Sequence, residues 1–87
     1  MIYKVTFSVR AKTQLEYLPK EVGKTILGWL VANMQGCDDP RTSGSAIRSE
    51  LGDFWLYKVD GFNLISILTD DRLVILSIEA DRNETDH

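Results

Sequence analysis

Two consecutive segments in the C-terminal half of the chain, 62–69 and 72–79, are apolar at nearly every position of their central parts, 64–68 and 73–78. Strands with one solvent-exposed face alternate between apolar and polar residues, so continuous apolar runs indicate central strands that are covered on at least one face. The preceding segment, 54–59, alternates, and the three are joined at Asp60-Gly61 and Asp70-Asp71, which are typical hairpin turns. The sequence therefore predicts three consecutive strands that need a covering layer.

The N-terminal segment begins with an alternating run, 2–7, that predicts a first strand. Ser8 is the expected N-cap of a short helix, because its hydroxyl can accept a hydrogen bond from a free amide of the first turn. This helix is predicted to reach Leu18 and to bury Val9, Leu15 and Leu18.

A second helix is predicted after Pro19, because proline ends the preceding helix and suits the first turn of the next. Gly36 ends this helix, and the segment 38–45 predicts an irregular connector. The buried face is predicted from helical spacing: Val22, Ile26, Trp29, Leu30 and Met34. The resulting order is β-α-α-β-β-β, an α+β fold with a helical hairpin packed on a mainly antiparallel four-stranded sheet.

Charge is distributed unevenly along the 87 residues, a length that suits a single domain over residues 1–87. The net charge is −3, but residues 1–25 have a local balance of +3, residues 38–60 of −2 and residues 70–87 of −4. The C-terminal half would therefore repel nucleic acid unless a few cations form a local pocket.

Neither a membrane nor a cofactor is indicated by the sequence. The longest mostly apolar stretch, 26–34, is far shorter than the ~20 residues of a spanning helix, and the N-terminus lacks the features of a signal peptide. Cys37 is the only cysteine, and the paired aspartates are typical turn-formers, so no metal site is expected. We therefore expect a cytoplasmic protein with no cofactor.

The segment 46–64 has the most distinctive pattern: Arg48 before a strand, Trp55-Leu56-Tyr57-Lys58 on it, a two-residue turn, then Phe62-Asn63-Leu64. It resembles the RelE/ParE superfamily of bacterial toxins from type II toxin–antitoxin modules. In that family the stretch typically contains Leu-Lys-Gly, then Trp-Arg-x-Arg, a turn and Tyr-Arg-Val. The resemblance also covers chain length, element order, the helical hairpin and a charged tail.

The resemblance to RelE-like members implies ribosome-dependent cleavage of mRNA, in which a 2′-hydroxyl attacks the adjacent phosphate. This chemistry needs a base, cations near the phosphate and an acid for the leaving oxygen. The resemblance implies Lys58, Arg82 and His87 as catalytic residues, and Arg48, Asn63, Asn83 and Tyr57 as substrate-binding residues.

Several of these positions have a second interpretation. Leu56 and Asn63 stand where the family usually has arginine, and either Arg82 or Asn83 matches the family's C-terminal arginine. His87 could equally be a solvated terminus, and Arg48, Lys58 and Arg82 solvated or locally paired charges. Aromatic residues such as Tyr57 are core residues first, although an exposed ring would stack on a base.

The resemblance implies a cognate antitoxin as partner, whose amphipathic segment covers the helices and the sheet. The ribosome and mRNA follow if the chain is an active nuclease, and operator DNA would be bound through the antitoxin. Two alternatives remain: a ParE-like toxin that binds DNA gyrase without nuclease chemistry, and a degenerate member that only binds its antitoxin.

Overall fold

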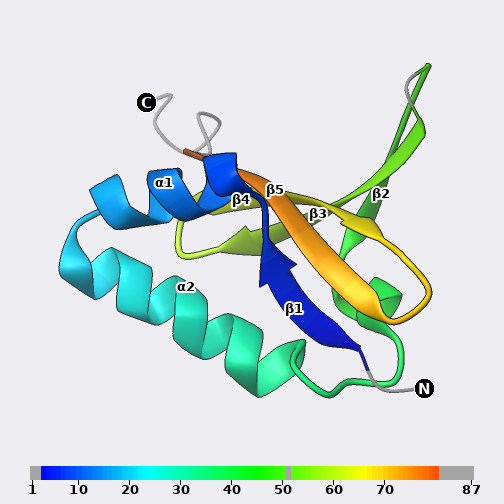
Figure 1. Ribbon diagram of the computed structural model, residues 1–87, viewed down its shortest axis with the longest axis horizontal. Coiled ribbons are helices and arrows are strands. Elements are labelled where there is room, and N and C mark those ends of the chain that lie inside the picture. The colour runs from blue at the N-terminus through cyan, green and yellow to red at the C-terminus, as the bar shows by residue number, and fades with distance from the viewer. Residues whose placement is uncertain (1–2, 51, 81–87) are drawn as a thin grey trace.

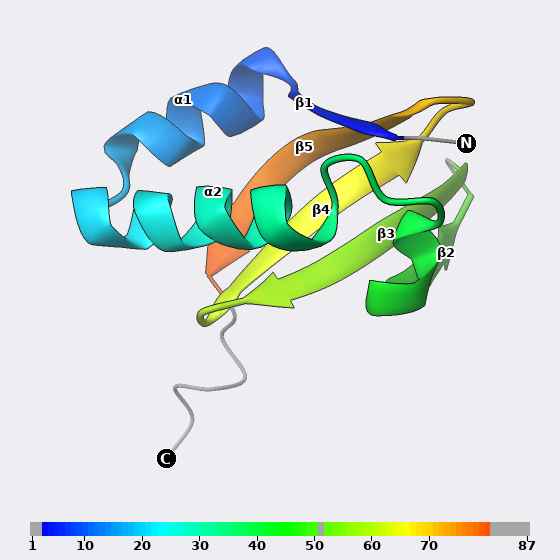
Figure 2. The same cartoon turned by 90° about the horizontal axis from the view of Figure 1, so that it is seen from below.

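The computed structural model describes residues 3–50 and 52–80. The chain forms a layer of helices on one face of a sheet (Figures 1 and 2). The elements, in chain order, are β1 (Lys4–Phe7), α1 (Val9–Tyr17), α2 (Lys20–Asn33), a short 3₁₀ helix η1 (Pro40–Ser43), β2 (Ser45–Ser49), β3 (Gly52–Val59), β4 (Phe62–Leu68) and β5 (Arg72–Ala80).

The sheet has the strand order β1-β5-β4-β3-β2, in which β1 runs parallel to β5 and the other neighbours are antiparallel. The predicted α+β class, with a helical hairpin on a mainly antiparallel sheet, is confirmed. The predicted number of strands is wrong, because the described residues form five strands and not four. The additional strand is β2, which pairs with β3 from Ser45 opposite Leu56 to Ser49 opposite Gly52.

The β3–β4 connection has the predicted geometry of a tight hairpin. Asp60 and Gly61 both have positive φ, at 52° and 79°. Two consecutive residues in this region are the signature of a type I′ turn, whose twist matches that of the flanking strands. This turn sets the register in which Lys58 lies opposite Asn63.

Helix α1 begins at the predicted cap but buries a different residue from the one expected. The Ser8 hydroxyl accepts from the Ala11 amide at 3.1 Å and donates to the Leu76 carbonyl oxygen at 2.9 Å. Ala11 is fully buried, whereas Val9 is 84% exposed, so the prediction that Val9 lies in the core is wrong. Tethering Ser8 to β5 turns the first helical turn so that the small Ala11 faces the sheet.

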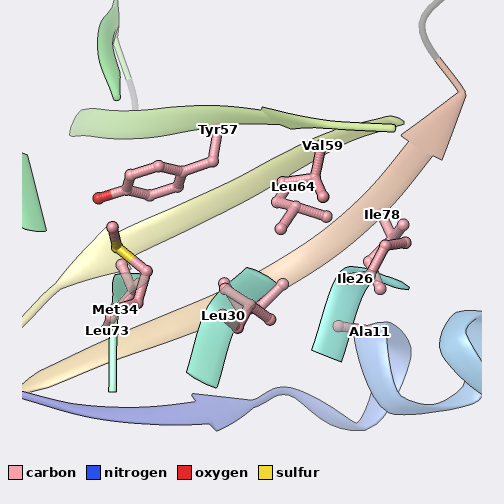
Figure 3. Close-up of a cluster of buried hydrophobic side chains, with 10 residues drawn as sticks. Ala11, Ile26, Leu30, Met34, Tyr57, Val59, Leu64, Leu73 and Ile78 are labelled. Carbon is pink, nitrogen blue, oxygen red and sulfur yellow. The ribbon is translucent and has the colours of Figure 1, made fainter. Parts of the chain in front are cut away.

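The core lies between α2 and the sheet. Figure 3 shows Ile26 and Leu30 of α2, and Met34 at its C-cap, beside core side chains of the strands. These three helix residues are at most 2% exposed, which confirms the predicted buried face of the second helix. The strand residues of the same cluster are Tyr57, Val59, Leu64, Leu73, Ile75 and Ile78.

The opposite face of the sheet is not covered by α1, α2 or η1, and we call it the open face (Figure 2). Strand side chains alternate between faces, so Leu56 and Lys58 lie on the open face because Tyr57 is in the core. In the described ranges, no helix combines the length and the apolar character needed to cross a bilayer.

Candidate functional site

The open face carries a short polar row where β3 and β4 meet at their hairpin. Lys58 lies opposite Asn63, and Asn63 lies opposite Glu79 on β5. Adjacent strands are about 4.8 Å apart, so the three residues cross neighbouring strands in one line. Ala80, the last described residue, lies opposite Phe62, so the chain leaves the sheet at the same end as this row.

Asn63 has an acceptor without a hydrogen bond. Its side-chain Oδ1 atom is buried, and no described residue donates to it. A buried acceptor without a partner costs about 1–3 kcal/mol, so this position lowers the stability of the fold. Asn63 lies opposite Lys58 in the strand register, so an exposed lysine and a partly buried amide share this end of the open face.

The side chain of Glu79, near the end of β5, contacts α1. Its carboxylate lies 3.8 Å from the Arg10 guanidinium and accepts from the Gln14 amide nitrogen at 3.4 Å. Gln14 also accepts from the Ile78 backbone amide at 2.7 Å, in the part of β5 that β1 does not pair. Helix α1 thus satisfies the strand edge and holds the Glu79 charge, a function that the sequence analysis did not anticipate.

The remainder of the open face is apolar along its central strands. Leu56 lies directly opposite Ile65, and Ile67 lies opposite Val74. All four side chains are only partly exposed, because they cover one another. The prediction that positions 56 and 58 share a face therefore holds, and the first of them contributes a leucine where a second cation was expected.

Arg48 is not part of the polar row. It lies opposite Asp53, near the far end of β3, whereas Lys58 lies near the β3–β4 turn. Five residues of strand separate these positions, which is about 17 Å at ~3.4 Å per residue. Arg48 and Lys58 therefore cannot hold the same phosphate group through the backbone arrangement seen in this structure.

Tyr57 is a core residue in this structure, in contrast to its predicted role in substrate binding. Its side chain is fully buried, and its hydroxyl donates to the carbonyl oxygen of Pro40 at 2.6 Å. Burial raises the pKa of this phenol to about 12. Its ring packs against Trp29 at a centroid distance of 5.8 Å, so neither of its faces is presented to a base on the open face.

No described residues form a cluster typical of a metal centre: no group of three or more His, Cys, Asp or Glu side chains is placed to share an ion. The carboxylate of Asp39 instead accepts from the backbone amide and the guanidinium of Arg41, at 3.1 and 3.0 Å. Asp39 is the N-cap of η1, and the hydrogen bonds that its carboxylate accepts there lower its pKa.

Comparison with known proteins gives a match at the level of structure. No protein-family model matches the sequence, and no curated protein matches it. A solved structure of the toxin–antitoxin complex RelBE2 from Mycobacterium tuberculosis contains a similar chain, with a TM-score of 0.80 at 21% identity, covering 92% of this chain and 99% of that one. The chain has the RelE-like toxin fold.

Two structures from Helicobacter pylori share the RelE-like fold at greater distance. A conserved hypothetical protein has a TM-score of 0.60 at 17% identity, covering 92% of this chain and 94% of that one. A copper-bound mutant toxin has a TM-score of 0.53 at 17% identity, covering 95% and 98%.

Within the RelE-like fold, the predicted site residues divide into three groups. Lys58 and Asn63 lie together on the open face, whereas Arg48 and Tyr57 lie elsewhere. The third group, Arg82, Asn83 and His87, lies outside the described residues, and the roles assigned to it stay predictions.

Proposed function

We propose that this chain is the toxin of a type II toxin–antitoxin module, that it acts in the cytoplasm, and that its activity is cleavage of ribosome-bound mRNA. The RelE-like fold supports the toxin assignment. The observation that carries the nuclease assignment is the polar row of the open face, where the exposed Lys58 lies opposite Asn63 in the strand register.

The two side chains suit the phosphate of an RNA backbone. The Lys58 ammonium can stabilise the negative charge that grows on the phosphate, and the Asn63 amide nitrogen can donate a hydrogen bond to a phosphate oxygen. The 2′-oxygen attacks phosphorus, its proton passes to a base, and the 5′-oxygen leaves with a proton from an acid. His87 is our candidate for proton transfer, and Arg82 or Asn83 for a further phosphate contact.

The expected contribution of Lys58 follows from its charge. A unit charge about 4 Å from the phosphate is worth about 4 kcal/mol at an effective dielectric constant of 20. If it acts only in the transition state, its removal slows cleavage by about a thousandfold. The leucine at position 56 leaves this end of the face with fewer cations than the family pattern, so a slow enzyme is expected.

The test is cleavage of a defined mRNA on programmed ribosomes, with the cut sites mapped by primer extension. We expect cuts in the ribosomal A site, loss of cleavage in Lys58→Ala and partial rescue by Lys58→Arg. The matched control is Lys24→Ala, which removes an exposed lysine from α2. Equal cleavage by the Lys58→Ala and Lys24→Ala variants would overturn the role of the polar row.

A second candidate function is favoured by the apolar character of the open face around Leu56 and Ile65. Such a surface suits a protein partner better than RNA, as expected for a gyrase-binding toxin or for a member that only binds its antitoxin. If expression of the chain in cells leaves mRNA intact and triggers a DNA-damage response, gyrase binding is supported. Antitoxin binding without growth arrest would support the inactive member.

A further inference from the structure

The open face is apolar at its centre and charged at one end. The charged end is the polar row, in which Lys58 on β3 and Glu79 on β5 are both exposed. The helices pack on the other face of the sheet (Figure 2). Contiguous apolar side chains that no second layer covers typically mark an interaction surface. The apolar side chains of the open face are partly exposed and come from four neighbouring strands: Ile47, Phe54, Leu56, Ile65, Ile67 and Val74.

The open face is complementary to itself because β4 is the middle of the five strands. In the sheet order, Lys58 lies one strand to one side of β4, and Glu79 lies one strand to the other side. Both residues lie opposite Asn63, so they are at the same level along β4. A two-fold axis along β4 exchanges the two sides of the sheet. It therefore places Lys58 of each copy over Glu79 of the other.

The same axis brings the apolar centres of the two faces together. It sets Ile65 and Ile67 of one copy against the same residues of the second copy. Two aligned sheets pack face to face about 10 Å apart, and the side chains of their inner faces interdigitate. An axis across the strands would instead place Lys58 over the Gly52 end of β3 and away from Glu79. The axis along β4 is therefore the one that uses both charges.

The Glu79 carboxylate remains accessible to a second cation. It lies 3.8 Å from the Arg10 guanidinium, and the Glu79 side chain is 47% exposed. An exposed ion pair of this kind is weak, so it does not prevent Glu79 from pairing with a lysine across an interface.

Two other occupants fit the open face less well. The chain's own segment 81–87 contains no apolar residue that could cover the apolar centre. An RNA backbone is attracted to the Lys58 end, but its phosphates gain nothing from the aliphatic side chains of Ile65 and Ile67. A second copy of this chain matches both the apolar centre and the charged end.

We propose that two copies of this chain associate through their open faces about a two-fold axis along β4. The apolar side chains form the centre of the interface, and two reciprocal pairs of Lys58 with the second copy's Glu79 fix its orientation. The dimer covers Lys58, so it is a resting form of the nuclease. That consequence rests on the proposed function, whereas the dimer itself does not.

The first test measures the mass of the full-length chain by sedimentation equilibrium over roughly 1–1,000 µM, the range of weak to moderate affinities. We expect the mass to rise from one chain to two chains. The Ile65→Glu variant should weaken this association by roughly tenfold or more, because it places two carboxylates in the apolar centre. The matched control is Val31→Glu, which makes the same kind of change at an exposed position of α2.

The second test exchanges the charges. Lys58→Glu alone brings carboxylates together in both pairs, and Glu79→Lys alone brings ammonium groups together, so each variant should dimerise roughly tenfold or more weakly. An equimolar mixture of the two variants restores an opposite charge in both pairs and should form a heterodimer. The controls are Lys24→Glu and Glu21→Lys, at exposed positions of α2. They should stay within about twofold of the unmodified chain, and circular dichroism verifies that every variant is folded.

The outcomes separate this inference from the proposed function, because neither test involves mRNA. A heterodimer that forms only on mixing supports the interface and its axis. A single-chain mass over the whole range overturns the inference and leaves the open face to the antitoxin or to mRNA. A dimer that the α2 variants weaken as much as the open-face variants do also overturns it. In both of these cases the toxin assignment and the cleavage assay are unaffected.

Discussion

Tyr57→Phe removes one buried hydroxyl and tests how the connector is held to the sheet. The hydroxyl donates to the Pro40 carbonyl oxygen at 2.6 Å, and Pro40 is itself almost fully buried. The variant loses this buried hydrogen bond, which costs about 0.5–1.5 kcal/mol. For a domain of this size that corresponds to a fall in melting temperature of about 4–8 °C per kcal/mol.

The same residue predicts a dependence on alkaline pH. An unfolded chain releases the phenolic proton near pH 10, whereas burial raises the pKa of Tyr57 to about 12 in the folded chain. Between these values the unfolded state binds fewer protons, so the free energy of unfolding falls as pH rises. The full stabilisation is present below pH 10, and about 2–3 kcal/mol is lost by pH 12.

The assay is urea denaturation of the unmodified chain, Tyr57→Phe and Tyr17→Phe at pH 7, 10, 11 and 12. Tyr17 is 86% exposed, so its variant should match the unmodified chain at pH 7. The stability advantage of the unmodified chain over Tyr57→Phe should shrink as pH rises above 10 and be gone by pH 12. A loss below about 0.5 kcal/mol at pH 7, or a constant difference between the two proteins across this range, would refute the reasoning.

Two further predictions concern backbone positions. In Gly44→Ala the added Cβ would lie 2.7 Å from the Tyr57 ring and 3.0 Å from the Leu56 carbonyl oxygen, so urea denaturation should show a loss of about 1–3 kcal/mol. Gly28→Ala is its control, because a Cβ there meets nothing within 4 Å and alanine favours the helix by about 0.5–1 kcal/mol. Ser8→Ala should cost about 1 kcal/mol and accelerate hydrogen exchange at the Ala11 amide; unchanged exchange would argue against the cap.

The order of elements could be predicted from the sequence because local signals agree with the fold. The apolar runs of β4 and β5, the Ser8 cap and the helical spacing of Ile26, Leu30 and Met34 each point to one structure. Strand β2 could not be predicted in this way. Its sequence, Ser-Ala-Ile-Arg-Ser, has little strand preference of its own, and it becomes a strand because β3 extends far enough to pair with it.

The candidate site could be predicted only in part, for a related reason. Strand alternation correctly predicts that Leu56 and Lys58 lie on one face of the sheet. The same alternation directs Tyr57 toward the helices, where its ring packs against Trp29 and its hydroxyl donates to the Pro40 carbonyl oxygen. The distance between Arg48 and Lys58 depends on the register of β2, which the sequence does not specify. The missing hydrogen bond of the Asn63 Oδ1 atom can be recognised only from the positions of the neighbouring donors in the structure.

The pairing of β1 with β5 also sets the order in which the protein can be completed during synthesis. Lys4 lies opposite Arg72, so the first strand of this sheet to be translated pairs with the last strand of the same sheet. At about 5–20 residues per second, the ribosome needs roughly 3–14 s to synthesise the intervening segment. During that time β1 has no strand to pair with, and the central sheet cannot close. The sheet is therefore completed only after β5 has been synthesised.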